Sequence, residues 1–400
     1  MRDFFKKNRK RYFTDIAKKI PAFKGQFVVI AHIVPDMPEV LEAINKISPI
    51  SLIIAIPYSL DMSTYNSLKD KYKIIDLSLE QLLDSEVLCQ VVGNQIDSEK
   101  PAILIEVGGY FSNITHKLQK VLDGKLLGVI EDTEAGHRRY LNSTNLSCPV
   151  VSMARSLLKE KEDFLVGSSC LHSFERLLRK LGHPTQNKDV LVVGFGKIGK
   201  GLAYALRQQN YSVRVYDIDP AKRVQALVEG FKVPEKAAAF QQAHIIFGAT
   251  GTCSVTGQDF NLLPHGAILV SCSSKKVEFD LDYLERNFKK QQIISNLDLY
   301  VGRNNKSIYL AAEGQPINFA IDKSLVGPVM ALIQAEILLG VRMLIQGSLS
   351  SSVVEVSVTD QLALAEKWLE YFCDNSTGCY KSTDAVPVIT LMKQLNEAYA

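Results

Sequence analysis

A glycine-rich loop near the middle of the 400-residue chain is the feature that most limits its fold. Residues 189–196 read DVLVVGFG, and Gly194, Gly196 and Gly199 form the pattern G-x-G-x-x-G ahead of a helical stretch. In such a loop the first glycine allows a tight turn, the second lets the backbone approach a pyrophosphate, and the third lets helix and strand pack closely. The loop therefore predicts a Rossmann strand–loop–helix unit that binds a dinucleotide at the helix N-terminus.

An acidic residue follows at the distance that this kind of site requires. Asp217 ends the next apolar run, 18 residues after Gly199. A carboxylate there accepts both hydroxyls of an adenosine ribose and repels a 2′-phosphate, so we expect NAD rather than NADP. Lys222 and Arg223 lie nearby and are the one feature against this choice. A Rossmann-like domain that no longer binds a nucleotide is the alternative interpretation.

Short apolar runs alternate with amphipathic stretches along most of the chain, which is typical of parallel sheets covered by helices on both faces. We therefore expect an α/β protein. The runs expected to form buried strands are 27–33, 51–58, 102–109, 126–132, 189–196, 212–219, 244–251 and 266–273. Helices are expected between them, for example over 37–47 and 198–209.

Composition and charge exclude several classes of protein. The chain is 46% hydrophobic and 22% charged with a net charge of +3, values typical of a globular protein and too mild for nucleic-acid binding. We interpret the basic start as the solvated face of an amphipathic helix, with an anionic partner as the lesser alternative. The basic residues are Lys6, Lys7, Arg9, Lys10 and Arg11.

No segment indicates export, a membrane or a metal. An apolar signal region and an uncharged run of about 18 residues are both missing, so we expect a cytoplasmic chain without a membrane partner. Residues 328–347 form an apolar helix that we interpret as a packed hinge or a subunit interface. The seven cysteines and seven histidines lack metal-binding spacing, so no metal is expected.

The glycine loop and its surroundings resemble one family. GFGKIGKGLAYALR followed by VRVYDIDPAKRVQALVEGF is similar to the cofactor domain of S-adenosylhomocysteine hydrolase. Other segments resemble the same family in the same order over roughly residues 25–345. They are GVIEDTEAGHRRY (128–140), KEKEDFLVG (159–167), FGATG (247–251), LPHGAILVSCSS (263–274) and LAAEGQPINFA (310–320).

The resemblance implies a domain plan. A Rossmann NAD-binding domain over 170–322 is inserted into a second α/β substrate domain formed by 1–158 and 324–372, with a cleft between the two. Residues 373–400 form a C-terminal tail, for which we expect a loop and one helix. This tail differs from the family's, which reaches a neighbouring subunit, so a homo-oligomer is expected but a tetramer of the family type is in question.

The family's chemistry, as the resemblance implies it, is reversible oxidation of a ribose 3′ alcohol by bound NAD, elimination of a 5′ thiolate and addition of water. Lys159 matches the lysine that helps the 3′ hydroxyl lose its proton, and Asp163 matches a partner aspartate four residues later. Asp132 takes the place of a diol-binding glutamate, and His32 that of an acid/base histidine. One surface ion pair between Lys159 and Asp163, and a packing role for His32, are the alternatives.

Cofactor contacts can be expected in the same way. The family has three threonines on the nicotinamide side, and Thr133 is the only one of them present in this chain. Asn318 matches an asparagine that contacts the nicotinamide amide in the family. The cofactor-binding residues expected are Gly194, Gly196, Lys197, Ile198, Gly199, Asp217, Thr133, Thr250, Gly251 and Asn318.

The elimination half of the site departs from the family. Tyr110 stands where the family has an aspartate, Ser274 and Leu325 replace two histidines, and Val34 and Asp36 replace adenine contacts. Each unpaired hydrogen-bonding group in a buried site costs about 1–3 kcal/mol, so S-adenosylhomocysteine is a doubtful substrate.

Four functions follow from these patterns. The first is an NAD-dependent enzyme that oxidises a secondary alcohol of a nucleoside-like or sugar-like substrate. The second is a catalytically impaired, NAD-binding regulatory or partner-binding protein. Hydrolysis of S-adenosylhomocysteine with substitute residues is a third, and a 2-hydroxyacid dehydrogenase is a fourth, although KKVEFD after residue 274 supplies no catalytic arginine.

Overall fold

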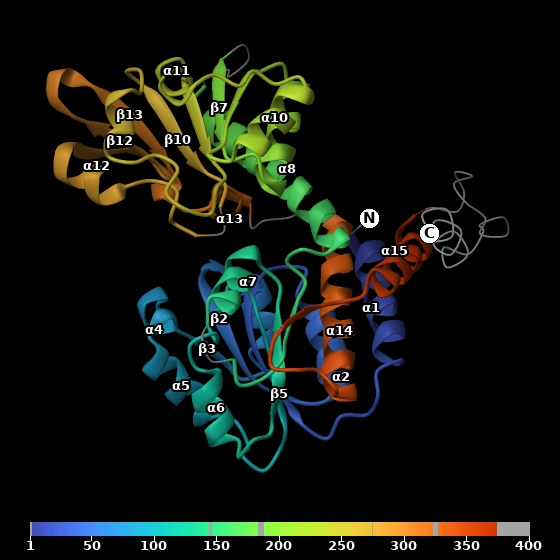
Figure 1. Cartoon of the computed structure of the whole chain (residues 1–400). Helices are drawn as coiled ribbons and strands as arrows, with labels where there is room; N and C mark the ends of the chain where they lie inside the picture. Colours follow the sequence, from blue (N-terminus) through green and yellow to red (C-terminus); the bar gives the residue numbers. More distant parts are fainter. Residues whose placement is uncertain (1, 144–145, 183–187, 274, 323–326, 374–400) are drawn as a thin grey trace, which may run out of the picture. The chain divides into compact units, whose positions relative to one another are not determined.

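The structure is a computed structural model that describes residues 2–143, 146–182, 188–273, 275–322 and 327–373. Expectations for Ser274, Leu325 and the tail 374–400 therefore lie outside the described residues. The chain divides into two compact units. The first comprises residues 1–57, 62–159 and 328–400, and the second comprises 58–61 and 160–327. Each is an α/β unit built on a seven-stranded sheet, as the alternating pattern predicted (Figure 1).

The sheet of the first unit has the order β14-β6-β5-β4-β1-β2-β3. Parallel pairs run from β14 through β6, β5 and β4 to β1, and again from β2 to β3. The strands are β1 (Gln26–Ile33), β2 (Ile50–Leu60), β3 (Ile74–Asp76), β4 (Ala102–Glu106), β5 (Leu126–Glu131), β6 (Val150–Ser152) and β14 (Val353–Glu355). The runs expected at 27–33, 51–58, 102–109 and 126–132 are all strands, whereas β3, β6 and β14 were not predicted because three residues are too short for a pattern.

The helices of the first unit fall into two groups. Helices α1, α2, α14 and α15 contact one another, whereas α4, α5 and α6 form a separate run of contacts. The helices are α1 (Arg2–Ala17), α2 (Pro38–Ile47), α3 (Met62–Leu68), α4 (Leu79–Leu83), α5 (Ser85–Gly93), α6 (Thr115–Val121), α7 (Glu134–Leu141), η4 (Gly327–Val329), α14 (Met330–Gln346) and α15 (Val358–Phe372).

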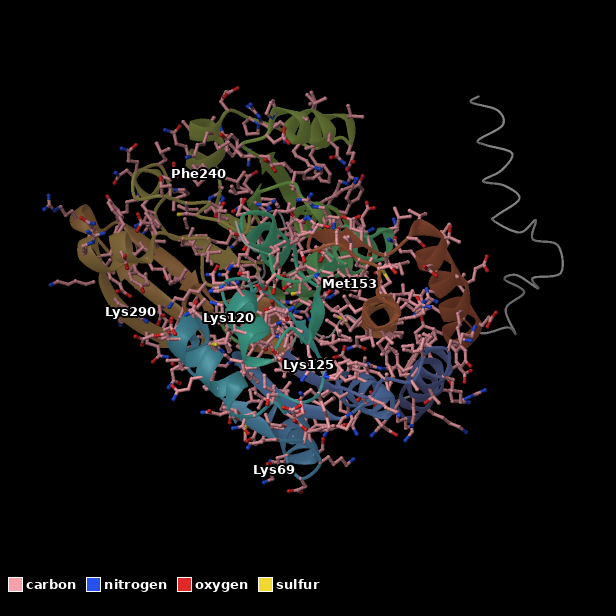
Figure 2. The ribbon with its side chains drawn as sticks, turned by 60° about the horizontal axis from the view of Figure 1, so that its bottom comes forward. Lys69, Lys120, Lys125, Met153, Phe240 and Lys290 are labelled. Atoms are coloured by element: carbon pink, nitrogen blue, oxygen red, sulfur yellow. The ribbon has the colours of Figure 1, made fainter. Side chains whose placement is uncertain are left out.

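Helix α14 is the core helix of this unit. Every residue from Ala331 to Val341 is buried, and the helix contacts β4, β5 and β6 on one side and α1, α2 and α15 on the other (Figure 1). Gly340 lets it approach the sheet, since a Cβ at that position would lie 2.7 Å from Cε of Met153, which Figure 2 labels. Residues 327–346 are the one stretch of the described chain apolar enough to span a membrane, and 61% of its most apolar part is buried. Most of its apolar surface is thus buried inside the unit, and its use as a subunit interface stays a prediction.

Helix α1 packs through its apolar face, as the basic amphipathic pattern predicted. Tyr12 and Phe13 are fully buried. Arg9 corrects the expectation of a wholly solvated basic face, because it is only 8% exposed. Its guanidinium donates to the side chain of Gln334 at 2.9 Å and lies 3.6 Å from Glu39. Arg9 thus links three helices, and its buried guanidinium is not exposed for a partner.

The second unit is a Rossmann fold with the sheet order β11-β12-β13-β10-β9-β7-β8. Its strands are β7 (Asp189–Val193), β8 (Ser212–Tyr216), β9 (Ile245–Gly248), β10 (Ala267–Ser271), β11 (Lys289–Ile294), β12 (Leu297–Val301) and β13 (Ser307–Ala311). Its helices are α8 (Leu157–Arg179), α9 (Lys197–Gln208), α10 (Pro220–Val228), α11 (Lys236–Gln241), η1 (Asp259–Asn261), α12 (Leu281–Asn287), η2 (Arg303–Asn305), η3 (Ala312–Gly314) and α13 (Ile317–Asp322). The four strands expected here, from 189–196 to 266–273, are all present.

Two apolar cores cover the faces of this sheet. Val190 and Val192 of β7 belong to one core, and Leu191 and Val193 belong to the other, which includes Phe240 of α11 (Figure 2). Because both faces are covered, the strand reads as a continuous apolar run rather than an alternating one.

An antiparallel edge completes the second sheet and was not predicted. Strand β11 pairs with β12, and β12 pairs with β13, both antiparallel. The side chains of β11 are exposed except at Ile294, which is partly buried. Its sequence KKQQII lacks the apolar signal of a buried strand, and charged residues of this kind protect a sheet edge from pairing with another chain. Lys290, labelled in Figure 2, pairs with Asp298 of β12 at 3.0 Å.

Candidate functional site

The first unit has the strand order of a doubly wound sheet, with β1 and β4 side by side at its centre. The chain runs outward from β1 to β2 and β3 in one direction, and from β4 to β5 and β6 in the other. Ligands of such sheets bind at the carboxyl ends of the strands where the order reverses. His32 lies at this end of β1, Gly108 and Gly109 follow β4, and Asp132 follows β5.

Lys159 and Asp132 form a buried ion pair at this edge. Lys159 Nζ lies 3.2 Å from Asp132 Oδ1, and the two side chains are 9% and 14% exposed. Lys159 stands in the first turn of α8, where its backbone N–H donates to Ser156 Oγ at 3.0 Å. Asp132 arrives from the end of β5, so the pair joins two segments that are distant in sequence. The alternative of an exposed ion pair does not apply to Lys159, because its side chain is buried.

His32 belongs to the same cluster. The pKa of His32 is lowered to about 4, mainly by burial; the Asp132 carboxylate acts in the opposite direction, and the Lys159 ammonium contributes to the decrease. The imidazole is therefore neutral at pH 7 and can accept a proton but cannot serve as a charged acid.

Glu336 of α14 completes this cluster and was not recognised from the sequence as a site residue. Its carboxyl accepts a hydrogen bond from the Ser156 hydroxyl at 2.8 Å, and it interacts electrostatically with Asp132 and Lys159. The sequence signal was an isolated glutamate in an apolar helix, a position where an acid is expensive unless it has partners.

The fourth expected catalytic residue lies in the other unit. Asp163 stands one helical turn after Lys159 on α8, and its Oδ2 lies 3.6 Å from Nζ of Lys197 in the glycine loop. The chain passes from the first unit to the second between Lys159 and Glu160, within α8. Three of the four expected catalytic residues are thus brought together in the first unit, and the fourth accompanies the glycine loop.

A buried acid, Glu131, shapes the loop beside Asp132. Its carboxylate accepts the backbone N–H groups of Gly108 at 3.0 Å, Gly109 at 2.8 Å and Thr133 at 2.6 Å. Thr133 Oγ1 donates to the same carboxylate at 2.7 Å and accepts the N–H of Gly136 at 3.0 Å, which caps α7. The single hydroxyl proton of Thr133 is therefore already used, although the sequence predicted that it contacts the nicotinamide.

Glu106 holds the neighbouring turn in the same way. Its carboxylate accepts the N–H groups of Tyr110 at 2.5 Å and Phe111 at 3.2 Å, and the Tyr140 hydroxyl. Glu106 and Glu131 are partners in the pairing of β4 with β5, and both are fully buried. Burial raises the pKa of both carboxyls, and their proximity raises that of Glu106 further. Tyr110 replaces the family's aspartate, and its side chain is 5% exposed.

The glycine loop of the second unit lies where its sheet order reverses, between β7 and β9. Gly194 has φ of +98°, and a Cβ there would lie 2.6 Å from the carbonyl oxygen of Ala249. A Cβ on Gly199 would lie 1.9 Å from the carbonyl oxygen of Gly194, whereas a Cβ on Gly196 would meet nothing within 4 Å. Gly194 and Gly199 are thus needed for the turn and the packing, and Gly196 leaves open space above the N-terminus of α9. The loop, including Lys197 and Ile198, fits a pyrophosphate.

Asp217 lies at the end of β8 beside this loop. Its Oδ2 accepts the N–H of Phe195 at 2.6 Å, and its Oδ1 accepts the N–H of Asp219 at 2.9 Å. Each oxygen keeps a lone pair that a ribose hydroxyl can use. Asn318 is buried at the start of α13.

A residue that the sequence analysis did not identify, Glu278, organises the loop after β9. This buried carboxylate accepts the N–H groups of Thr250 and Gly251, each at 2.8 Å, and the hydroxyl of Thr250 at 2.9 Å. Gly251 has φ of +73° and open space around its Cα. The expected cofactor contacts Thr250 and Gly251 are thus held in place, with their N–H groups already bound. Glu278 follows two lysines in KKVEFD, a context that did not indicate a buried acid.

Comparisons with known proteins agree with this geometry. Residues 170–324 match the family model "S-adenosyl-L-homocysteine hydrolase, NAD binding domain". The chain is 30% identical over 227 residues to adenosylhomocysteinase from Thermotoga maritima, a match that covers 56% of each chain. It thus spans about half the length of this curated relative. Because the glycine loop and Asp217 fit a dinucleotide and the matched domain binds NAD, the cofactor is NAD.

Solved structures match the chain at lower sequence identity. Phosphoglycerate oxidoreductase from Vibrio cholerae is 14% identical, with a TM-score of 0.39, over 76% of this chain and 96% of its own. D-lactate dehydrogenase from Salmonella is 11% identical, with a TM-score of 0.44, over 82% and 99%. No group of three or more possible metal ligands was found among the described residues. These matches cover part of the chain: residues 170–324 are similar to the NAD-binding domain of S-adenosylhomocysteine hydrolase, and 227 residues are similar to an adenosylhomocysteinase.

Proposed function

We propose that this chain uses bound NAD to oxidise a secondary alcohol of a nucleoside-like or sugar-like substrate. The observation that carries the proposal is the buried Lys159–Asp132 ion pair beside a neutral His32, at the carboxyl edge of the first sheet. A buried cation next to an acid and a proton acceptor is the set of groups that alcohol oxidation needs. The relationship to the hydrolase family supports the same assignment.

Bound NAD would accept the hydride that leaves the alcohol carbon. The protein's own residues act on the oxygen and its proton. The Lys159 ammonium stabilises negative charge on the alcohol oxygen, and the neutral His32 imidazole accepts a proton. Asp132 keeps Lys159 in place and binds a neighbouring hydroxyl of the substrate. In this proposal Asp163 acts beside Lys197 at the cofactor.

The same proposal holds that S-adenosylhomocysteine is a poor substrate. Tyr110 brings a phenol to the position where the family has a carboxylate, and the neighbouring acids Glu106 and Glu131 are committed to backbone N–H groups. A site that lacks two or three polar partners loses about 10² to 10⁴ in affinity for the ligand that needs them.

The test is whether any candidate substrate reduces bound NAD to NADH. Purified protein with NAD is incubated with a panel of nucleosides, nucleoside thioethers and sugars, and the NADH absorbance band is followed. We expect NADH with at least one secondary alcohol and little homocysteine release from S-adenosylhomocysteine. If NAD binds but no compound reduces it, the result favours the alternative of an NAD-binding regulatory or partner-binding protein.

We also propose that the chain is a cytoplasmic homo-oligomer, either a dimer or a tetramer. The support is its relationship to an enzyme family that acts on small molecules. Sedimentation of the NAD-bound protein at several concentrations measures the assembly, and a monomer at all of them would contradict this part of the proposal.

A further inference from the structure

Helix α14 carries a buried acid that is connected to Lys159 through one hydroxyl group. Ser156 Oγ donates to Oε2 of Glu336 at 2.8 Å, and it accepts the backbone N–H of Lys159 at 3.0 Å. A serine has a single hydroxyl proton, so donating it to Glu336 orients the lone pair that receives Lys159. Glu336 therefore helps to fix the first turn of α8, the turn that presents Lys159.

Glu336 also belongs to the electrostatic surroundings of Lys159. It is fully buried, and its Oε1 has no hydrogen-bond partner among the described residues. The pKa of Glu336 is raised to about 7, mainly by burial, and Asp132 and Glu355 contribute to the increase. The Ser156 hydroxyl and the Lys159 ammonium act in the opposite direction.

We propose that Glu336 is a positioning residue for Lys159. It holds the start of α8 through Ser156, and its ionised form accepts a stronger hydrogen bond from that hydroxyl and attracts the Lys159 ammonium group beside Asp132. The inference rests on the proposed function, since it assigns Glu336 to the reaction in which Lys159 acts on the alcohol oxygen. Nothing in the resemblance of the sequence to the hydrolase family pointed to this residue.

A pH dependence follows from this arrangement. Glu336 ionises as the pH rises through about 7, so its negative charge is present above this pH and absent well below it. His32, with a pKa of about 4, stays neutral over the same range. Tyr12 of α1 also faces Glu336, and burial raises its pKa far above this range. We therefore expect the rate of NADH formation to rise as the pH increases through 7.

The variant Glu336→Gln separates charge from hydrogen bonding. Its amide oxygen still accepts the Ser156 hydroxyl, but the side chain cannot ionise. We expect the rate above pH 7 to fall about tenfold and its rise through pH 7 to disappear. NAD affinity is expected to be unchanged, because the glycine loop lies in the other unit. Arg342→Met is the matched control. Arg342 lies on the same helix as Glu336, and the substitution breaks its partly buried ion pair with Asp360 of α15.

A second measurement does not depend on activity. In the NAD-bound protein labelled at the glutamate carboxyl carbons, NMR should show one signal that titrates near pH 7 and is missing from Glu336→Gln. Lys159→Met removes a positive charge, so it should move this midpoint to higher pH. Lys159→Arg and Arg342→Met should leave it close to its original value.

The outcomes separate the two proposals. If the wild-type protein forms no NADH with any candidate substrate, the proposed reaction is wrong whatever the NMR shows. If the Glu336 signal does not move in Lys159→Met, the positioning role is wrong even in an active enzyme. A rate rise through pH 7 that persists in Glu336→Gln also overturns it.

Discussion

The two candidate sites of this molecule are built from different materials. The site in the second unit is made of backbone, because Gly194 and Gly199 have no room for a side chain and Gly196 leaves open space at the N-terminus of α9. The site in the first unit is made of buried charge, in which Lys159 and Asp132 meet from distant segments. A backbone site leaves a fixed local spacing in the sequence, whereas a cluster of charges forms only when the sheet brings strand ends together. The first can be read from one short motif, and the second needs the fold.

The largest effect is expected when the cation of the charge cluster in the first unit, Lys159, is removed. Lys159→Met is expected to lower the rate of NADH formation by about 10³ or more, because the alcohol oxygen loses its positive partner. NAD affinity should not change, which equilibrium dialysis measures. Lys161→Met is the matched control on the same helix, since the Lys161 side chain is 65% exposed. Equal losses in the two variants would show that the charge cluster has no special role.

The backbone site is tested by adding one carbon atom. Gly196→Ala places a Cβ in open space, so the fold is expected to survive while NAD affinity falls about 10²-fold or more. Gly199→Ala places its Cβ 1.9 Å from a carbonyl oxygen, so it should destabilise the second unit itself. Calorimetric titration with NAD and thermal unfolding distinguish these results. A Gly196→Ala variant that binds NAD normally would contradict the placement of the pyrophosphate.

A substitution of Asp217 is expected to have a smaller effect, and it tests the preference for NAD over NADP. Asp217→Ala removes the acceptor for the ribose hydroxyls and is expected to weaken NAD binding by about 10- to 100-fold. The preference for NAD over NADP should narrow at the same time, because the repulsion of the 2′-phosphate is lost. Affinities for both cofactors, measured in one buffer, check the ratio. If the ratio of the affinities for NAD and NADP does not change, Lys222 and Arg223 rather than Asp217 determine which cofactor is preferred.

The buried acids predict a modest dependence of stability on pH. The folded pKa values of Glu106 and Glu131 lie above those of the unfolded chain, so the native state binds more protons. Stability should therefore be greatest below about pH 4.5 for these groups and fall by about 1 kcal/mol or more as the pH rises through neutrality. Urea unfolding at several pH values measures this, and Glu106→Gln should flatten the slope. A stability that rises with pH in this range would contradict the assignment.

Much of the fold could be predicted from the sequence, because each long parallel strand is covered on both faces and reads as an apolar run. The eight expected strands are present. The strands that were missed are the antiparallel edge, β11, β12 and β13, and the three-residue β3, β6 and β14. The exposed β11 and the three-residue strands leave no apolar pattern.

The candidate sites were predictable to different degrees. The glycine loop and Asp217 follow from spacing, whereas Lys159, Asp132 and His32 were suggested by the family resemblance and stay a prediction as catalytic residues. The acids that organise the loops were missed, because burial of a carboxylate depends on which N–H groups the fold brings to it. Glu131 and Glu278 are buried for this reason.

The hydrogen bonds of Glu106 have a consequence for how such a protein can change. This acid holds the turn after β4 through the backbone N–H of Tyr110, not through its ring. This hydrogen bond does not use the side chain at position 110, so it can persist when one residue there is exchanged for another. A lineage, or a protein engineer, can alter the chemistry at this strand end one amino acid at a time without first rebuilding the framework around it.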